Sequence, residues 1–148
     1  MKDRNHRPHR GFTLIELIAV IVILAILVGV ALPKYFDYAG DARAAATKGT
    51  IGGVRAGVAN YFANKSITGS AAYPDVTDLN SLGSVMQESI PPNPYDDVST
   101  VWEQTTEASA DSRTLVGTSG GWAYYTNGTS KAIFYANTDT AGVSENDF

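Results

Sequence analysis

The chain has 148 residues, with 15 acidic and 11 basic side chains, two histidines and no cysteine. This length accommodates one small globular domain together with an anchoring segment, and the lack of cysteine excludes disulfides. Both histidines lie within the first ten residues. The rest of the chain therefore lacks the side chains that Ser-His and Cys-His nucleophiles and most zinc sites need. No glycine-rich phosphate-binding loop is present either, so the composition predicts that the protein is not an enzyme.

The N-terminus combines a basic stretch with a long apolar one. The first ten residues read MKDRNHRPHR and carry four basic side chains against one acidic side chain. Residues 12–32 come next, and Glu16 is the only charged residue among these twenty-one. As a helix this run is about 30 Å long, which matches the core of a bilayer. Because basic flanks stay in the cytoplasm, we expect a single membrane span with a cytoplasmic N-terminus and an exported remainder.

Three other interpretations of the apolar run are a buried core helix, a cleavable signal peptide and a plain signal anchor. Core helices of soluble proteins are rarely apolar over such an uninterrupted length. No small-residue cleavage site separates the run from the downstream residues, as a secretory signal peptide requires. A plain anchor explains the apolar residues but leaves Glu16 without a purpose. A carboxylate in a membrane-length helix is costly, and it usually has a function.

The apolar run opens with the motif G-F-T-L-I-E-L at residues 11–17. This motif, followed by an apolar helix, resembles the class III leader of type IV pilins and type II secretion pseudopilins. The resemblance implies that a membrane aspartyl peptidase cuts after Gly11 and methylates the new N-terminal residue, Phe12. Glu16 is then the fifth residue of the mature chain, and Pro33 falls where the family has its helix-bending proline. The strong resemblance covers about residues 8–60, and the segment P-K-Y-F-D within it is similar to pilins of the mannose-sensitive haemagglutinin type.

The same resemblance implies a life cycle for the protein. The subunit would wait in the inner membrane with its head in the periplasm, and an assembly platform driven by an ATPase would extract it into a helical filament of identical or homologous subunits. Glu16 would meet the charged amine of Phe12 on a neighbouring subunit, which offsets the cost of the carboxylate and sets the register. The alternatives that remain are a surface pilin, a subunit of a periplasmic pseudopilus that drives protein export, and a signal-anchored binding or enzymatic domain.

The charge of the exported part is acidic. Residues 1–11 hold four of the eleven basic and one of the fifteen acidic residues, which leaves seven against fourteen, formally −7. This balance argues against general nucleic-acid binding. The family resemblance raises calcium as a ligand of the acidic tail, where Asp139, Glu145 and Asp147 offer suitable oxygens. Their spacing fits no calcium loop, so we expect no cofactor and keep calcium as an alternative, with Asp96 and Asp97 as a weaker site.

The helix is expected to continue beyond the membrane span as an amphipathic segment over residues 34–65. Its apolar stripe recurs every three to four residues and consists of Ile51, Val54, Val58 and Phe62. Pro33 lacks a backbone donor, so a kink is predicted around residues 29–33. The two segments, 12–33 and 34–65, are thus expected to form one bent helix.

A row of small residues runs along the same helix at intervals of four: Ala45, Gly49, Gly53 and Gly57. Each glycine lowers helix propensity by about 1 kcal/mol relative to alanine. One interpretation is a flat strip that allows the backbone of another subunit to approach closely. The other is that the row packs against the sheet of its own chain. The sequence does not decide between them.

The remaining residues, 66–148, are expected to form a small α/β head with an acidic tail. A short helix is predicted between Asp75 and Gly83, with Thr77 or Asp78 as its N-cap and Gly83 as its stop. Short strands are predicted at Val101-Trp102 and at residues 114–116.

The strongest strand signal is a pair of aromatic and β-branched runs, Trp122–Tyr125 and Ala132–Tyr135, around the turn pair Asn127-Gly128. We expect Trp122, Tyr124 and Phe134 to pack on the helix stripe as core. The predicted fold is therefore α+β: a cleaved leader over 1–11, then a long helix whose second half packs on a small antiparallel sheet.

Overall fold

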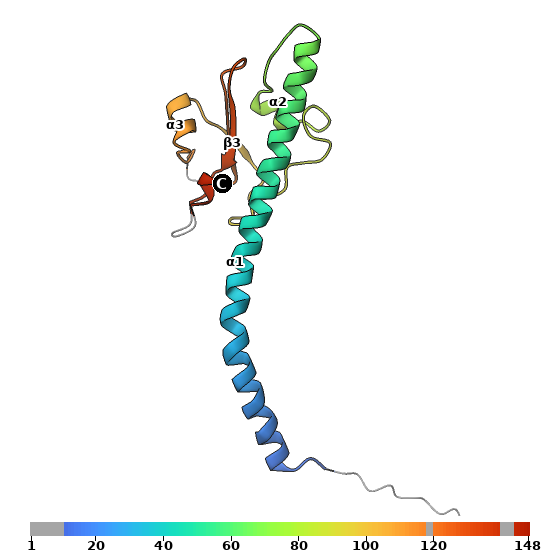
Figure 1. The fold of residues 1–148 in the computed structure, drawn as a ribbon, viewed down its shortest axis with the longest axis vertical. Helices are drawn as coiled ribbons and strands as arrows, with labels where there is room; N and C mark the ends of the chain where they lie inside the picture. The colour runs from blue at the N-terminus through green and yellow to red at the C-terminus, as the bar shows by residue number, and fades with distance from the viewer. Residues whose placement is uncertain (1–10, 118–119, 140–143) are drawn as a thin grey trace, which may run out of the picture. The chain divides into compact units, whose positions relative to one another are not determined.

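The computed structural model describes residues 11–117, 120–139 and 144–148. Its longest element is α1, a 54-residue helix over Leu14–Ile67 (Figure 1). The chain divides into two compact units, Met1–Gly40 and Asp41–Phe148. We call the second one the head unit, and each unit is described by itself.

The first unit contains the apolar part of α1. Every residue from 11 to 38 is exposed to solvent in the single chain. Among the described residues, α1 is the one helix long and apolar enough to span a membrane by length and composition. The helix runs unbroken through Pro33. The predicted kink therefore does not divide α1 into separate helices.

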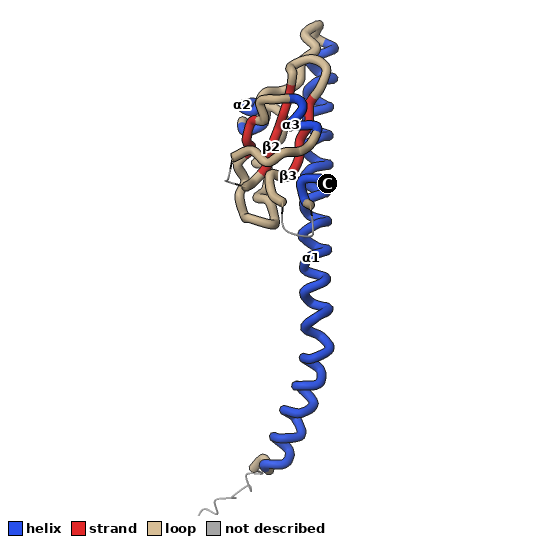
Figure 2. The backbone as a smooth tube through the Cα atoms, turned by 90° about the vertical axis from the view of Figure 1, so that its left-hand side faces the viewer, coloured by secondary structure: helices blue, strands red, loops and turns tan. Residues whose placement is uncertain are grey.

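The head unit contains a three-stranded sheet in the order β1-β2-β3 (Figure 2). β2 (Trp122–Thr126) and β3 (Ala132–Ala136) form the predicted antiparallel hairpin, with Trp122 opposite Ala136. β1 (Val101–Glu103) pairs with β2 in parallel, so the sheet is mixed rather than purely antiparallel. The intervening segment 104–121 is long enough for the crossover that a parallel pair requires. It contains the short helix α3 (Glu107–Asp111), which the sequence analysis did not predict.

The short helix α2 begins and ends earlier than predicted. It spans Val76–Asn80, and its N-cap is Asp75 rather than Thr77 or Asp78. The Asp75 carboxylate accepts a bond of 2.8 Å from the backbone N–H of Asp78, and the Asp78 carboxylate accepts one of 3.3 Å from the N–H of Asp75. This reciprocal capping box fixes the start of the helix. Gly83 lies beyond its end.

Residues 114–116 do not form the predicted strand. Both backbone groups of Val116 bond to the side chain of Asn137, its N–H to Oδ1 at 2.7 Å and its C=O to Nδ2 at 2.9 Å. Asn137 is buried. A single amide thus satisfies the groups that a neighbouring strand would otherwise pair, so this segment needs no ladder.

The core of the head unit lies between α1 and the hairpin. Trp122, Tyr124 and Phe134 are fully or almost fully buried, and they cluster with the α1 residues Ile51, Val54 and Val58. The rings of Trp122 and Phe134 stack with centroids 5.5 Å apart. The indole N–H of Trp122 donates to the carbonyl of Pro91 at 2.9 Å, so its one polar atom is satisfied. The prediction that these aromatic residues form the core is confirmed.

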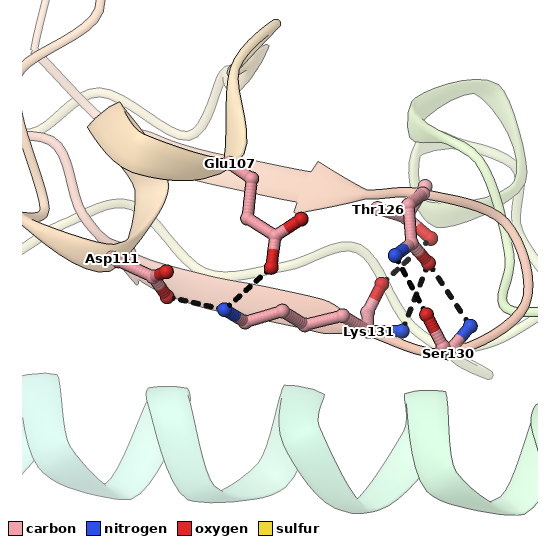
Figure 3. A network of polar contacts seen from close by, with 6 residues as sticks. Glu107, Asp111, Thr126, Ser130 and Lys131 are labelled. Atoms are coloured by element: carbon pink, nitrogen blue, oxygen red, sulfur yellow. Dashed lines mark hydrogen bonds and ion pairs between the residues drawn. The ribbon is translucent and has the colours of Figure 1, made fainter.

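The hairpin connection is longer than a two-residue turn. It runs from Asn127 to Lys131, and the Asn127 Oδ1 accepts the backbone N–H groups of residues 129, 130 and 131. The ammonium of Lys131 contacts Glu107 at 2.9 Å and Asp111 at 2.6 Å, one turn apart on α3 (Figure 3). These two carboxylates raise the pKa of Lys131. The network ties α3 to the hairpin at an exposed place, where ion pairs contribute little to stability.

The glycines in the row on α1 differ in their surroundings: one packs within its own chain, and the others form an exposed strip. A Cβ added at Gly57 would lie 2.8 Å from the Met86 sulfur and 3.2 Å from the Val85 carbonyl. A Cβ at Gly49 or Gly53 would meet no atom within 4 Å. Gly57 therefore lets the loop after α2 pack directly on the helix, while the other two glycines leave a flat exposed strip.

This difference predicts opposite effects of two matched substitutions on the stability of the head unit. Gly53→Ala should raise the free energy of unfolding by up to about 1 kcal/mol, because alanine favours the helix and meets open space. Gly57→Ala should lower it, because the new methyl group displaces Met86 and crowds a backbone carbonyl. Urea denaturation of both variants measures the two changes. An equal gain for both would show that the loop does not pack closely at Gly57.

Candidate functional site

The start of α1 is closed by a hydrogen-bonded pair. Glu16 Oε2 accepts a bond of 2.9 Å from the backbone N–H of Thr13 and one of 2.8 Å from its hydroxyl. The Thr13 Oγ1 in turn accepts the backbone N–H of Glu16 at 3.3 Å. This is a capping box of the form T-x-x-E. The carboxylate also lies at the positive end of the helix dipole, where negative charge is favoured.

Thr13 is therefore part of the site, and the sequence analysis missed it. The signal was present, because Thr13 and Glu16 have the spacing of a capping box directly before an apolar run. The structure shows that Glu16 has a hydrogen-bonding partner within its own chain. In the single subunit its carboxylate is thus partly satisfied before it meets any other molecule.

The proposed cleavage point lies just ahead of this cap. Gly11 and Phe12 are outside the helix, and the Phe12 side chain is 84% exposed. A Cβ at Gly11 would meet no described atom within 4 Å. Packing within the described part of the chain therefore does not require glycine at this position. Residues 1–10, the rest of the predicted leader, lie outside the described residues.

The far end of the apolar run carries a group of exposed aromatic residues. Tyr35, Phe36 and Tyr38 lie directly after Pro33, and all three are 66–69% exposed. The neighbouring Lys34 adds a charge. Aromatic and basic side chains at this place are typical of the interface between a bilayer and water. The structure brings Gly11, Phe12 and Glu16 together at the first turn of α1, whereas Pro33 lies some five turns away.

The acidic tail does not form a recognisable cation site in the described part of the chain. No group of three or more His, Cys, Asp or Glu side chains able to hold a metal ion occurs there. Asp147 contacts Arg113 at 3.4 Å, and Glu145 is fully buried. Asp96 accepts the backbone N–H groups of Gly121 and Val98, so its role in the fold is local. Residues 140–143 of the tail lie outside the described residues, and calcium binding by the acidic tail stays a prediction.

Comparison with known proteins identifies the N-terminal segment. Residues 6–32 match the family described as the prokaryotic N-terminal methylation motif. This N-terminal part is similar to type IV pilins, and we call residues 6–32 the pilin-class segment for that likeness. The pilin-class segment includes Gly11, Phe12, Thr13 and Glu16, the residues that the structure places at the first turn of α1.

Three relatives give the extent of the likeness. The chain is 40% identical over 58 residues to the fimbrial protein EcpC of Eikenella corrodens, which is 39% of this chain and 38% of the relative. It is 43% identical over 58 residues to the type IV major pilin protein PilE of Neisseria gonorrhoeae, 39% of this chain and 35% of the relative. It is 46% identical over 50 residues to the type IV narrow pilus major component PilA5 of Thermus thermophilus, 34% of this chain and 43% of the relative.

The chain thus matches 35–43% of the length of these curated relatives. No solved structure matches it. The likeness consequently bears on the pilin-class segment, and the greater part of the head unit is described from its own residues alone.

Proposed function

We propose that this protein is a structural subunit of a type IV pilus-like filament and not an enzyme. The observation that carries the proposal is the exposure of every residue from 11 to 38, on a helix whose only charged side chain before Lys34 is the capped Glu16. Apolar surface of this size must be covered, either by lipid or by other apolar helices. A pilin-class subunit uses both covers in turn, the membrane before assembly and neighbouring copies of α1 afterwards.

The proposal includes the processing and location of the subunit. A prepilin peptidase would remove residues 1–11 and methylate Phe12. The chain would then stay in the inner membrane with its basic end in the cytoplasm and its head in the periplasm, until an assembly platform and its ATPase extract it. A contact between copies that does not close on itself generates a filament.

The three relatives are named as pilus or fimbrial components. Their names favour a surface pilus over the pseudopilus of a secretion system, which was the main alternative from the sequence. Electron microscopy of cells labelled with an antibody against the head separates the two. Labelled filaments outside the cell support the pilus, whereas a loss of protein secretion without filaments on deletion supports the pseudopilus.

Processing provides a direct test of the pilin assignment. We expect the mature protein to begin at Phe12 and to carry one methyl group on its amine. Gly11→Val should leave the leader attached in nearly all molecules, because a branched side chain would stand where the peptidase must bind the backbone. Since Gly11 has open space in the described structure, the substitution should leave the stability of the head unchanged. Intact-mass measurement of the membrane fraction decides the matter, and a mature species that keeps residues 1–11 would remove the assignment.

A further inference from the structure

The head unit has an apolar groove between α1 and the hairpin. Its volume is about 250 Å³. The residues that line it include Ala59 and Phe62 of α1, Phe134 of β3, and Tyr73 and Tyr124. Phe62 and Tyr73 stack with centroids 4.3 Å apart, which fixes one end of the groove. Ala59 is exposed at the surface, so the groove opens to solvent.

The other end of the groove is basic. The Arg55 Nη2 donates to the carbonyl oxygen of Phe134 at 3.0 Å and to a main-chain oxygen of Phe148 at 3.4 Å. The ammonium of Lys48 lies 4.4 Å from the centroid of the Phe148 ring. Burial, and then the charge of Arg113, lower the pKa of Arg55. Arg55 and Lys48 thus place two positive charges at this end of the groove, where they can face an acidic neighbour.

A matching projection lies on the same unit. Leu82, in the loop after α2, is 69% exposed. The loop is held in place by a bond of 2.7 Å from the N–H of Gly83 to the carbonyl of Met86, and Met86 packs against Gly57 of α1. Residues 75–88 contain three acidic side chains and no basic one. The loop therefore presents an apolar side chain from a rigid, acidic segment, which complements the apolar groove and its basic end.

The projection and the groove lie on different flanks of α1. The loop packs on the helix face of Gly57, Asn60 and Tyr61, whereas Arg55, Ala59 and Phe62 line the groove. At 3.6 residues per turn these two faces are about 170° apart around the helix. Figure 1 shows the loop after α2 and strand β3 on opposite sides of α1. Because the projection and the groove lie on opposite flanks of α1, they cannot contact each other within one chain. Between chains, contacts of this kind form an open series.

We propose that the Leu82 loop of one subunit docks into the Ala59–Phe62–Phe134 groove of a second copy of this chain. This contact between heads deepens the proposed filament function and rests on it. The Leu82 side chain enters the apolar part of the groove, and the acidic segment 75–88 lies against the end that carries Arg55. The contact adds to the burial of α1 and selects copies of this chain over pilin-class subunits that share only the N-terminal helix.

The absence of cysteine from the sequence allows a direct test in the full-length protein. Both Leu82 and Ala59 are exposed, so Leu82→Cys and Ala59→Cys should not disturb folding. Filaments of the double variant, oxidised on the cell and run on a denaturing, non-reducing gel, should give a ladder of dimers, trimers and longer species. The matched control combines Ala59→Cys with Leu115→Cys, since Leu115 is the other exposed leucine of the head, at 41%. The control pair and the single variants should give no ladder.

A second measurement needs no cysteine. Leu82→Asp should reduce incorporation of the subunit into filaments several-fold against a co-expressed wild type, and Leu115→Asp should not. If filaments form but the double cysteine variant gives no ladder, the docking contact is wrong and the filament function stands. The same holds if both aspartate variants are incorporated equally. A chain that makes no filaments would overturn both, because the contact rests on the filament.

Discussion

Replacing Trp122 by alanine is expected to lower the free energy of unfolding of the head unit by about 3–5 kcal/mol. Trp122 is 0% exposed, stacks on Phe134 and donates its indole N–H to the Pro91 carbonyl. The substitution leaves a cavity between α1 and the hairpin, and it also leaves the Pro91 carbonyl without its donor. Since small domains are stable by only about 5–15 kcal/mol, the loss is a large share of the total.

The measurement is chemical denaturation of a soluble fragment that begins at Lys34 and so lacks the membrane-length run. The matched control is Trp102→Phe. Trp102 is only half buried, and its Nε1 has no acceptor among the described residues. Removing that unpaired N–H while keeping an aromatic ring should change stability by less than about 1 kcal/mol. An unchanged midpoint for Trp122→Ala would mean that the hairpin's aromatic residues do not hold the core.

The hairpin and the long helix were predictable because their signals are periodic and local. The stripe of Ile51, Val54 and Val58 fixes the buried face of α1, and the aromatic runs around Asn127-Gly128 fix the hairpin. In both patterns, a few neighbouring residues are enough to identify the element and its buried face. The sequence therefore correctly predicted that the helix stripe and the aromatic residues of the hairpin form the core together.

The wrong predictions concern segments whose hydrogen-bonding partners are distant in the sequence. Residues 114–116 have the composition of a strand, but the buried amide of Asn137 bonds both backbone groups of Val116. The parallel pairing of β1 with β2 likewise depends on the path of the segment 104–121, which no local signal describes. Sequence spacing alone contains neither contact, so the sheet was predicted as purely antiparallel.

The candidate site shows the same contrast between local sequence motifs and contacts that form only in the folded chain. The motif at residues 11–17 predicts roles for Gly11, Phe12 and Glu16, and these roles stay predictions. The role of Thr13 was not predicted, although its spacing from Glu16 is that of a capping box. The groove and the Leu82 loop were beyond the sequence altogether, since residues from α1, β3 and two loops meet there only in the folded head unit.

The two possible roles of Glu16, charge and helix cap, are separable by three substitutions. Glu16→Gln removes the charge, but glutamine still completes a capping box with Thr13. Thr13→Ala removes the cap and keeps the carboxylate. Glu16→Ala removes both. All three variants should enter the membrane, and the two that lack the charge should enter at least as readily as the wild type.

We expect the charge to decide assembly. An ionised Glu16 in an apolar bundle needs a cationic partner, and in the proposed filament the amine of Phe12 on a neighbouring subunit would supply one. Glu16→Gln and Glu16→Ala should therefore both fall in filament incorporation by on the order of tenfold or more, whereas Thr13→Ala should assemble close to the wild-type level, since an exposed cap contributes only about 1 kcal/mol. Mass spectrometry of sheared filaments, with each variant co-expressed beside the wild type, gives the incorporation ratio relative to the membrane pool. If Glu16→Gln assembles normally and Thr13→Ala does not, the carboxylate acts as a helix cap and not as the group that sets the register between subunits.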